Sequence, residues 1–597
     1  MLKRLFTQLL YRNIGHQRQL ASQKPSLSIE PKPDDTWQSS IAVLVEQGKF
    51  REAILFAENA IEQNADSYKL HIQIGTLHAK LKEYQQAAQY FQKATSLEPM
   101  QAGGFKNLGA VYIMSGNLGH AQAALERALE LDPHASTPWT NIGLVKLLQG
   151  KVEEAKAAFT QAIAIDPRQL LTWQIKLRQL LCDPKATLQE IGEAHKEFAE
   201  IMEKPILAKH APVPFSNPPI AGRQIRVAYL SSDFKNHPVG YNMLPILKHH
   251  DRSQFEIFLY GIVLPDESAT LPFQQIAHQW RNVYNKSDQE IAALMRADGI
   301  DILVVLAGHF DDNRLLVTAY RPAPVQVSYH DPVTSGLQSM DYLISDITLT
   351  PRGSAEAFTE QLIRLPTYYV HAPFEDSPTV DELPARQNGY ITFGSFNNPS
   401  KISPEVVGLW SAVLKAVPKA RLLLKYHNVF SEPAIVTHYE GLFRAHGIDS
   451  GRLIFNGKAY PRGSHLALYN QIDIALDPFP FTGATTTFEA LWMGVPVVSL
   501  AGERMVARWS ASMLRRVGLD WLISRDPDEY LQIAAKLASN LDQLGALRST
   551  LRAGLVASPL CDARRRTRHL ESAFRYMWCK WCQQQAGAGM PLSVPHN

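Results

Sequence analysis

The sequence of 597 residues is poor in cysteine, in long apolar runs and in net charge. Four cysteines are too few for a disulfide framework and favour a reducing compartment. No run of 18 apolar residues occurs, so no membrane span is expected. The 60 basic and 57 acidic residues nearly cancel, which speaks against a general binder of nucleic acid or membrane surfaces. We therefore expect a cytoplasmic protein that neither binds nucleic acid nor spans a membrane.

Several familiar site motifs are also missing. Neither G-x-x-x-x-G-K-[ST] nor G-x-G-x-x-G occurs, which excludes a P-loop kinase and a typical nicotinamide enzyme. No clear paired-carboxylate metal motif stands out. Cys579 and Cys582 form C-x-x-C, but no second Cys or His pair follows, and two helix residues one turn apart are the simpler interpretation.

The N-terminal segment differs from the rest of the chain. Its first 29 residues contain five Lys or Arg and no acid, with apolar residues on one helical face. This composition fits a basic arm, which we assign to residues 1–36, or a mitochondrial-type targeting segment. The remaining length allows roughly three or four domains.

A 34-residue period organises the first third of the chain. This interval separates Gly75, Gly109 and Gly143, and it also separates Pro99 from Pro133. Alanines recur at the same interval in four units. Small residues at a fixed period predict antiparallel helix pairs that pack closely and stack into a superhelix. The pattern resembles the tetratricopeptide repeat, and with the following helices it covers residues 37–203.

Two asparagines share one position of this repeat, Asn107 and Asn141. An amide both donates and accepts hydrogen bonds, so it can pair with a peptide backbone of any sequence. We predict that these residues bind an acceptor peptide in the groove of the repeats. The alternative is that the repeats only dock or dimerise the protein, so a homo-oligomer stays possible.

Two α/β halves follow a Pro-rich linker at residues 204–224. Short β-branched and aromatic runs separated by helix-length segments predict a parallel sheet at 225–385 and a second at 386–555. Residues 556–597 are assigned to a C-terminal helix and tail. Two doubly wound domains bind ligands beyond the carboxyl ends of their strands.

The segment "GATTTFEALWMGVPVVSL", residues 483–500, lies in that region. Thr485, Thr486 and Thr487 follow a glycine at an expected helix start, where free N–H groups suit phosphate oxygens. Lys401 follows another strand and can neutralise a diphosphate. These residues predict a site for phosphate groups.

The repeats and the motifs "RVAYLSSDFKNHPVGY", "FNNPSKISP" and "GATTTFEALWMGVP" together resemble the protein O-linked N-acetylglucosamine transferases and their SPINDLY relatives. The resemblance runs from about residue 37 to 582. It implies a tetratricopeptide superhelix followed by a GT-B glycosyltransferase of two Rossmann-like domains. It also implies a UDP-N-acetylglucosamine donor, a Ser or Thr acceptor, inversion at the anomeric carbon and no metal, and we expect no cofactor.

The resemblance assigns roles to single residues. His237 corresponds to a histidine beside the reacting sugar, a candidate general base, and Lys401 to the lysine that binds the diphosphate. A phosphate oxygen of the donor could act as the base instead. The residues expected to bind the nucleotide sugar are Asn398, Lys401, Arg462, His465, Thr485, Thr486, Thr487 and Glu489.

The chain departs from the acetylglucosamine transferases at four places: Asn398, Ala484, Tyr241 and residues 330–333. We therefore keep two alternatives to N-acetylglucosamine transfer. One is a SPINDLY-like protein O-fucosyltransferase that uses GDP-fucose. The other is a repeat scaffold with an inactive transferase domain.

Overall fold

The computed structural model describes residues 36–63, 67–210, 213–264, 267–310 and 312–585. The basic arm predicted at residues 1–36 therefore lies outside the described residues, except for Thr36. The chain forms two compact units, residues 1–176 with 264–267 and residues 177–263 with 268–597. No helix among the described residues is long and apolar enough to cross a membrane.

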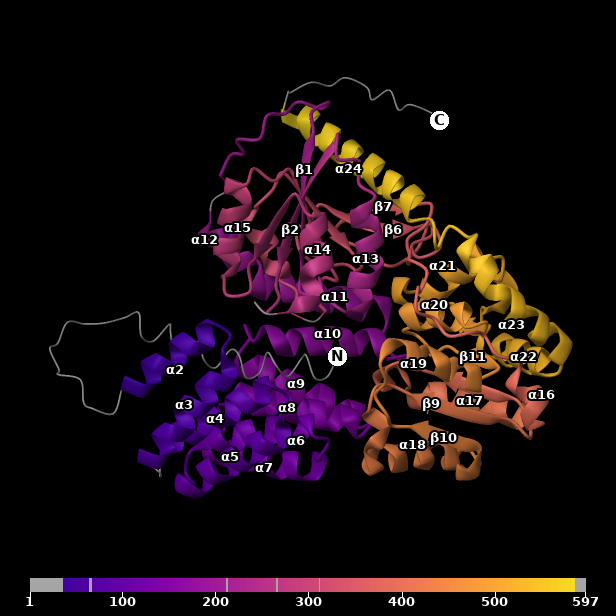
Figure 1. The fold of residues 1–597 in the computed structure, drawn as a ribbon, viewed down its shortest axis with the longest axis horizontal. Coiled ribbons are helices and arrows are strands. Elements are labelled where there is room, and N and C mark those ends of the chain that lie inside the picture. The colour runs from indigo at the N-terminus through magenta and orange to yellow at the C-terminus, as the bar shows by residue number, and fades with distance from the viewer. Residues whose placement is uncertain (1–35, 64–66, 211–212, 265–266, 311, 586–597) are drawn as a thin grey trace. The chain divides into compact units, whose positions relative to one another are not determined.

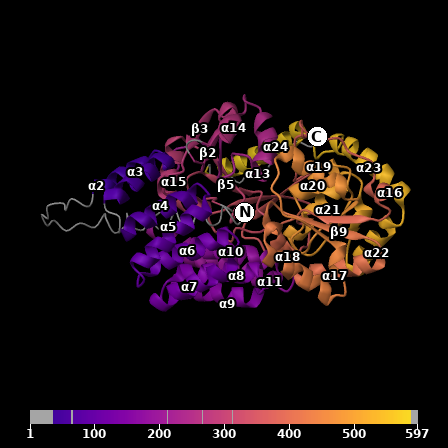
Figure 2. The same ribbon diagram turned by 60° about the horizontal axis from the view of Figure 1, so that its bottom comes forward.

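The first unit is a stack of antiparallel helix pairs (Figures 1 and 2). Its helices are α2 (Thr36–Glu46), α3 (Phe50–Gln63), α4 (Tyr68–Lys80), α5 (Tyr84–Leu97), α6 (Ala102–Met114), α7 (Leu118–Leu131), α8 (Ser136–Leu148) and α9 (Val152–Ile165). A Cβ added to Gly75 would lie 2.7 Å from the ring of Phe91 on the paired helix. A Cβ added to Gly109 would lie 2.6 Å from the side chain of Leu125. Only glycine allows this approach, so the structure confirms the predicted repeat.

Three helices lead from the repeats to the first sheet: α10 (Leu170–Cys182), α11 (Leu188–Met202) and α12 (Lys204–Lys209). The loop between α10 and α11 is held by Arg504, whose guanidinium donates to the carbonyls of Asp183 and Ala186. At the other end of α11, Glu203 accepts hydrogen bonds from the backbone N–H groups of Gln338 and Ser339, both at 2.8 Å. Residues 177–203 thus connect both sheet domains.

The first sheet is seven-stranded, entirely parallel and ordered β3-β2-β1-β4-β5-β6-β7. Its strands are β1 (Ile225–Ser231), β2 (Phe255–Gly261), β3 (Gln279–Asn282), β4 (Ile302–Leu306), β5 (Val325–Tyr329), β6 (Tyr342–Asp346) and β7 (Gln361–Leu365). The helices of this domain are α13 (Pro238–Lys248), α14 (Leu271–Ile276) and α15 (Asp288–Ala297). The central strands are buried on both faces, as their continuous apolar runs require.

The second sheet is six-stranded and parallel, ordered β10-β9-β8-β11-β12-β13. Its strands are β8 (Thr392–Ser395), β9 (Arg421–Lys425), β10 (Leu453–Asn456), β11 (Ile474–Leu476), β12 (Val497–Leu500) and β13 (Ile523–Ser524). Its helices are α16 (Pro384–Asn388), α17 (Pro404–Ala416), α18 (Pro433–Ala445), α19 (Arg462–Ala467), α20 (Thr485–Trp492), α21 (Trp509–Arg516), α22 (Pro527–Ala538) and α23 (Leu541–Val556).

The last helix, α24 (Ala563–Gln585), returns from the second sheet domain to the first (Figure 1). Arg566 donates to the hydroxyl of Tyr329 at 2.7 Å, and Glu571 accepts from the backbone N–H of Asp251 at 2.7 Å. The C-terminal segment therefore packs on the N-terminal sheet domain. Repeats followed by two parallel sheets confirm the predicted superhelix and GT-B architecture.

Candidate active site

Lys401 ends a short helical turn, η4 (Pro399–Lys401), just after β8. Its Nζ donates to the carbonyl of Thr482 at 2.8 Å and lies 4.0 Å from the ring centroid of Phe481. Burial lowers the pKa of Lys401 to about 8, although Cys182 and Asp477 oppose the shift. The ammonium is thus a deeply placed cation beyond the carboxyl ends of β8 and β11.

Asp477 follows β11 and fixes the loop that carries Thr482. One carboxylate oxygen accepts from the N–H of Gly483 at 2.8 Å, and the other accepts from the hydroxyl of Ser499 at 2.7 Å. The carbonyl of Thr482, which accepts from Lys401, therefore lies in a loop that Asp477 holds in place. No motif in the sequence points to this aspartate.

The start of α20 lies beside this loop, as predicted. The hydroxyl of Thr485 accepts from Tyr369 at 3.3 Å, and that of Thr486 donates to Asn397 at 3.0 Å. Thr487 differs: it is only 2% exposed, and its hydroxyl pairs with Ser510 at 2.8 Å. Successive helix residues turn by about 100°, so three consecutive hydroxyls cannot face one ligand. The expectation that all three do is wrong for Thr487.

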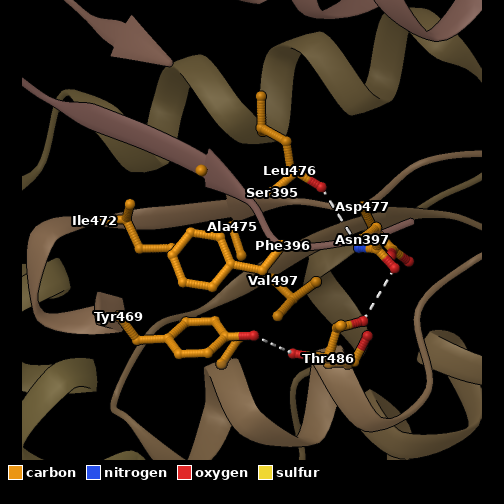
Figure 3. A pocket seen from close by; sticks show the side chains of 13 residues that line it. Ser395, Phe396, Asn397, Tyr469, Ile472, Ala475, Leu476, Asp477, Thr486 and Val497 are labelled. Atoms are coloured by element: carbon orange, nitrogen blue, oxygen red, sulfur yellow. Dashed lines mark hydrogen bonds between the residues drawn. The ribbon is translucent and has the colours of Figure 1, made fainter. Parts of the chain in front are cut away.

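A small cavity lies under the start of α20 (Figure 3). The rings of Phe396 and Tyr469 lie against each other with centroids 4.4 Å apart, and the Tyr469 hydroxyl donates to the carbonyl of Thr486 at 3.3 Å. Asn397, two residues after the end of β8, accepts from Thr486. These contacts fix the first turn of α20, whose unpaired N–H groups suit an anion.

Glu489, one turn further along α20, ends a chain of polar groups. Its Oε2 lies 3.1 Å from Nε2 of His465 and accepts from the Tyr469 hydroxyl at 3.3 Å. Nδ1 of His465 lies 2.6 Å from Nζ of Lys425, the last residue of β9. Burial raises the pKa of Glu489, but His465, His371 and Arg462 outweigh it and hold that pKa below its ordinary value. Glu489 is therefore an ionised acceptor.

Arg462 lies between two aromatic rings. Its guanidinium is 3.9 Å from the centroid of Tyr241, on α13, and 4.2 Å from that of Phe374. A terminal nitrogen lies 3.4 Å from Nε2 of His371. Tyr241, one of the departures from the family pattern, therefore packs against a predicted nucleotide-binding residue from the other sheet domain.

His237 is the N-cap residue of α13, and its side chain makes no capping hydrogen bond. Its Nδ1 lies 3.1 Å from Oδ1 of Asp233, a fully buried carboxylate after β1. Asn313 donates to the other oxygen of Asp233 at 3.4 Å and accepts from the N–H of Ser232 at 2.9 Å. A buried carboxylate close to a half-buried imidazole is an arrangement that suits a general base.

Tyr369 links the two sides of the site. Its hydroxyl accepts from the Asn242 amide at 3.3 Å and donates to Thr485 at 3.3 Å. Asn242 lies on α13, the helix that His237 begins, and Thr485 begins α20. The Tyr369 hydroxyl thus links the helix that His237 begins to the start of α20.

Residues 330–333, where the sequence differs from the acetylglucosamine transferases, directly follow β5. His330 has a positive φ of 61°, and Asp331 is buried, so a Cβ on Gly308 would overlap its carboxylate. Val333 packs in the same apolar cluster as Phe481, whose ring holds Lys401. The altered segment therefore supports the lysine from the opposite sheet domain.

Three predicted asparagines face the protein itself. The side chain of Asn398 accepts from the N–H of Ser400 at 3.0 Å and so caps η4. Asn107 is 7% exposed and Asn141 is 0% exposed, because neighbouring first helices pack together. The two amides are thus covered in the free chain, which the repeat pattern alone did not indicate. Among the described residues, no group forms a hydrogen bond with the side-chain nitrogen or oxygen of Asn141.

Comparisons with known proteins agree with this architecture. Residues 183–375 and 381–570 match the description of glycosyl transferase family 41, and residues 35–170 match the C-terminal domain of cilia and flagella-associated protein 70. The solved structure of a mutant Thermobaculum terrenum O-GlcNAc transferase is 34% identical with a TM-score of 0.78, covering 87% of this chain and 98% of that chain.

Curated relatives include plant proteins named probable UDP-N-acetylglucosamine–peptide N-acetylglucosaminyltransferase SPINDLY. The Hordeum vulgare protein is 36% identical over 411 residues, 68% of this chain and 43% of that protein. The Oryza sativa protein is 37% identical over 380 residues, 63% of this chain and 41% of that protein. The chain thus spans about two fifths of the length of these relatives.

Proposed function

The chain belongs to glycosyl transferase family 41, and from this premise we propose that it transfers N-acetylglucosamine from UDP-N-acetylglucosamine to Ser and Thr hydroxyls of proteins. The observation that carries the proposal is the placement of Lys401 beside the start of α20, beyond the carboxyl ends of β8 and β11. This is where a doubly wound domain binds a nucleotide. The names of the relatives support the choice of donor.

The proposed reaction is an inverting displacement of the nucleoside diphosphate by the acceptor hydroxyl. Negative charge builds on the leaving diphosphate, where the Lys401 ammonium and the N–H groups of Thr485 and Thr486 would stabilise it. His237, oriented by Asp233, would accept the proton of the hydroxyl. Because fixed positive groups face the leaving group, we propose that the reaction needs no metal.

The nucleoside end of the donor would lie over Arg462, His465 and Glu489. The Glu489 carboxylate can accept from ribose hydroxyls, and the Arg462 guanidinium, stacked on Tyr241, presents donors to a base. Protein acceptors would be recruited by the repeats of the first unit.

The thermal melting of the full chain with added nucleotides tests this assignment. UDP and UDP-N-acetylglucosamine should raise the melting temperature, because ligands that bind only the folded state stabilise it. A rise with GDP and GDP-fucose alone would support the O-fucosyltransferase alternative. No rise with any nucleotide would favour the repeat scaffold.

Transfer efficiency should depend on pH through Lys401. Only the charged ammonium attracts the diphosphate, and burial lowers its pKa to about 8 in the free enzyme. We therefore expect kcat/KM for the donor to fall as the pH rises through about 8, approaching tenfold per further unit. The profile should be measured for wild type and for Lys401→Arg, which stays charged. An unchanged fall in the arginine variant would assign the ionisation to another group.

The acceptor role of the repeats predicts a selective defect. We propose that acceptor binding uncovers these buried amides. Asn107→Ala combined with Asn141→Ala should then lower kcat/KM for protein acceptors about 30-fold, through loss of two backbone hydrogen bonds worth about 1 kcal/mol each. Donor hydrolysis should stay unchanged, and a thermal melt of the double variant checks that it is folded. Gln89→Ala with Gln161→Ala, at exposed positions of second helices, is the matched control. Equal loss of transfer and hydrolysis would contradict the acceptor role.

A further inference from the structure

We propose that Lys425 is a positioning residue for the nucleotide: it fixes the tautomer of His465, which in turn holds Glu489 ready to bind the ribose. The inference deepens the proposed function and rests on it for the identity of the ligand. The tautomer of His465 is a property of the free chain, so it can be measured without any nucleotide sugar.

Lys425 is an unusual lysine because it is only 4% exposed. It ends β9 after three buried leucines and pairs in register with Asn456 of β10. Its ammonium lies 2.6 Å from Nδ1 of His465 and 5.8 Å from the ring centroid of Tyr460. A buried cation is costly unless it is paired, so a lysine here needs a specific partner.

The contacts determine where the proton of His465 lies. A lysine ammonium has three donors and no acceptor, so Nδ1 of His465 must accept. A neutral imidazole then carries its proton on Nε2. That nitrogen lies 3.1 Å from Oε2 of Glu489, an acceptor. Burial lowers the pKa of Lys425 to about 8 while Glu489 opposes the shift, so the ammonium is the main form at pH 7.

The result is a buried cation and a buried anion joined through one imidazole ring. His465 and Tyr469 both donate to Oε2 of Glu489. Within the described part of the chain no group donates to Oε1 of Glu489. One carboxylate oxygen is therefore held by the protein, and the other remains for two ligand hydroxyls.

Removal of the ammonium would undo this order. In Lys425→Met no donor keeps Nδ1 of His465 as an acceptor, so the ring can rotate or change its protonation, and its donation to the carboxylate is no longer fixed. The carboxylate would then lose a donor and its fixed orientation. Because the ribose is remote from the reacting carbon, the lost contact affects ground state and transition state alike, so KM changes and kcat does not.

The first measurement is the ¹⁵N spectrum of the histidine rings in the free full-length chain, with His465 assigned by His465→Gln. We expect the Nε2–H tautomer in wild type, its loss in Lys425→Met and its retention in Lys425→Arg, since guanidinium also only donates. Lys419→Met, at the exposed entrance to the same strand, is the matched control and should leave the spectrum unchanged. A wild-type ring protonated on Nδ1 overturns the inference, even if a variant fails to fold.

The second measurement is the steady-state kinetics of transfer from UDP-N-acetylglucosamine. Lys425→Met should raise the donor KM about tenfold with kcat within about twofold, the order expected for one misplaced charge-assisted hydrogen bond. Lys425→Arg should restore most of the affinity. An unchanged KM, or a loss confined to kcat, contradicts the positioning role. If wild type shows the Nε2–H tautomer but uses no UDP donor, the proposed function fails while the tautomer assignment stands.

Discussion

Lys401→Met is expected to lower single-turnover transfer by about 100- to 1000-fold at saturating donor, the largest effect of any substitution considered. The ammonium lies where charge develops on the leaving diphosphate, and loss of one such preorganised group typically costs about 3 to 4 kcal/mol. Methionine keeps the length of the side chain against Phe481 but carries no charge. Because the contact strengthens in the transition state, kcat should fall as well as affinity.

The melting temperature of the variant distinguishes a loss of catalysis from misfolding. The lowered pKa of Lys401 shows that the folded state favours the neutral amine, so below about pH 8 its charge opposes folding. Lys401→Met should therefore melt at the same temperature as wild type or higher. Lys415→Met, exposed near the end of α17, should change neither rate nor melting. A methionine variant with near wild-type transfer would place the diphosphate elsewhere.

His237→Ala is expected to lower kcat by about 100-fold or more, the range typical for loss of a general base. Its Nδ1 lies 3.1 Å from the Asp233 carboxylate, so Nε2 is the nitrogen left to accept a proton. The helix start should survive, because His237 makes no capping hydrogen bond. Single-turnover transfer at saturating donor is the measurement.

The binding of UDP provides the control for His237, since the histidine should not contribute to nucleotide affinity. Asp233→Asn should also lower kcat, because an amide no longer fixes the orientation and tautomer of the ring. A folded alanine variant whose turnover barely changes would exclude His237 as the base. A donor phosphate oxygen would then be the remaining candidate.

The architecture was predictable because its signals repeat in the sequence. The 34-residue period of Gly75, Gly109 and Gly143 reflects a steric requirement, since each glycine meets a large side chain of the paired helix. Lys401 was predictable from its place after a strand, because parallel strands end at one edge of the sheet. Such features need only local pattern and sheet geometry.

Other parts of the site depend on tertiary structure. Lys425, His465 and Glu489 come from β9, α19 and α20, and nothing in their spacing indicates that they meet. The hydroxyl of Thr487 faces inward because of where this residue lies around the axis of α20. Asn141 occupies the predicted repeat position, yet neighbouring helices cover it.

The most direct test of the central claim is transfer itself. The purified full-length chain should be incubated with UDP-N-acetylglucosamine and a protein mixture from its source, and modified peptides identified by mass spectrometry. We predict one added N-acetylhexosamine on Ser or Thr residues, absent when Lys401→Met replaces wild type. Modification with GDP-fucose but not with UDP-N-acetylglucosamine, or none with either donor, would contradict the account.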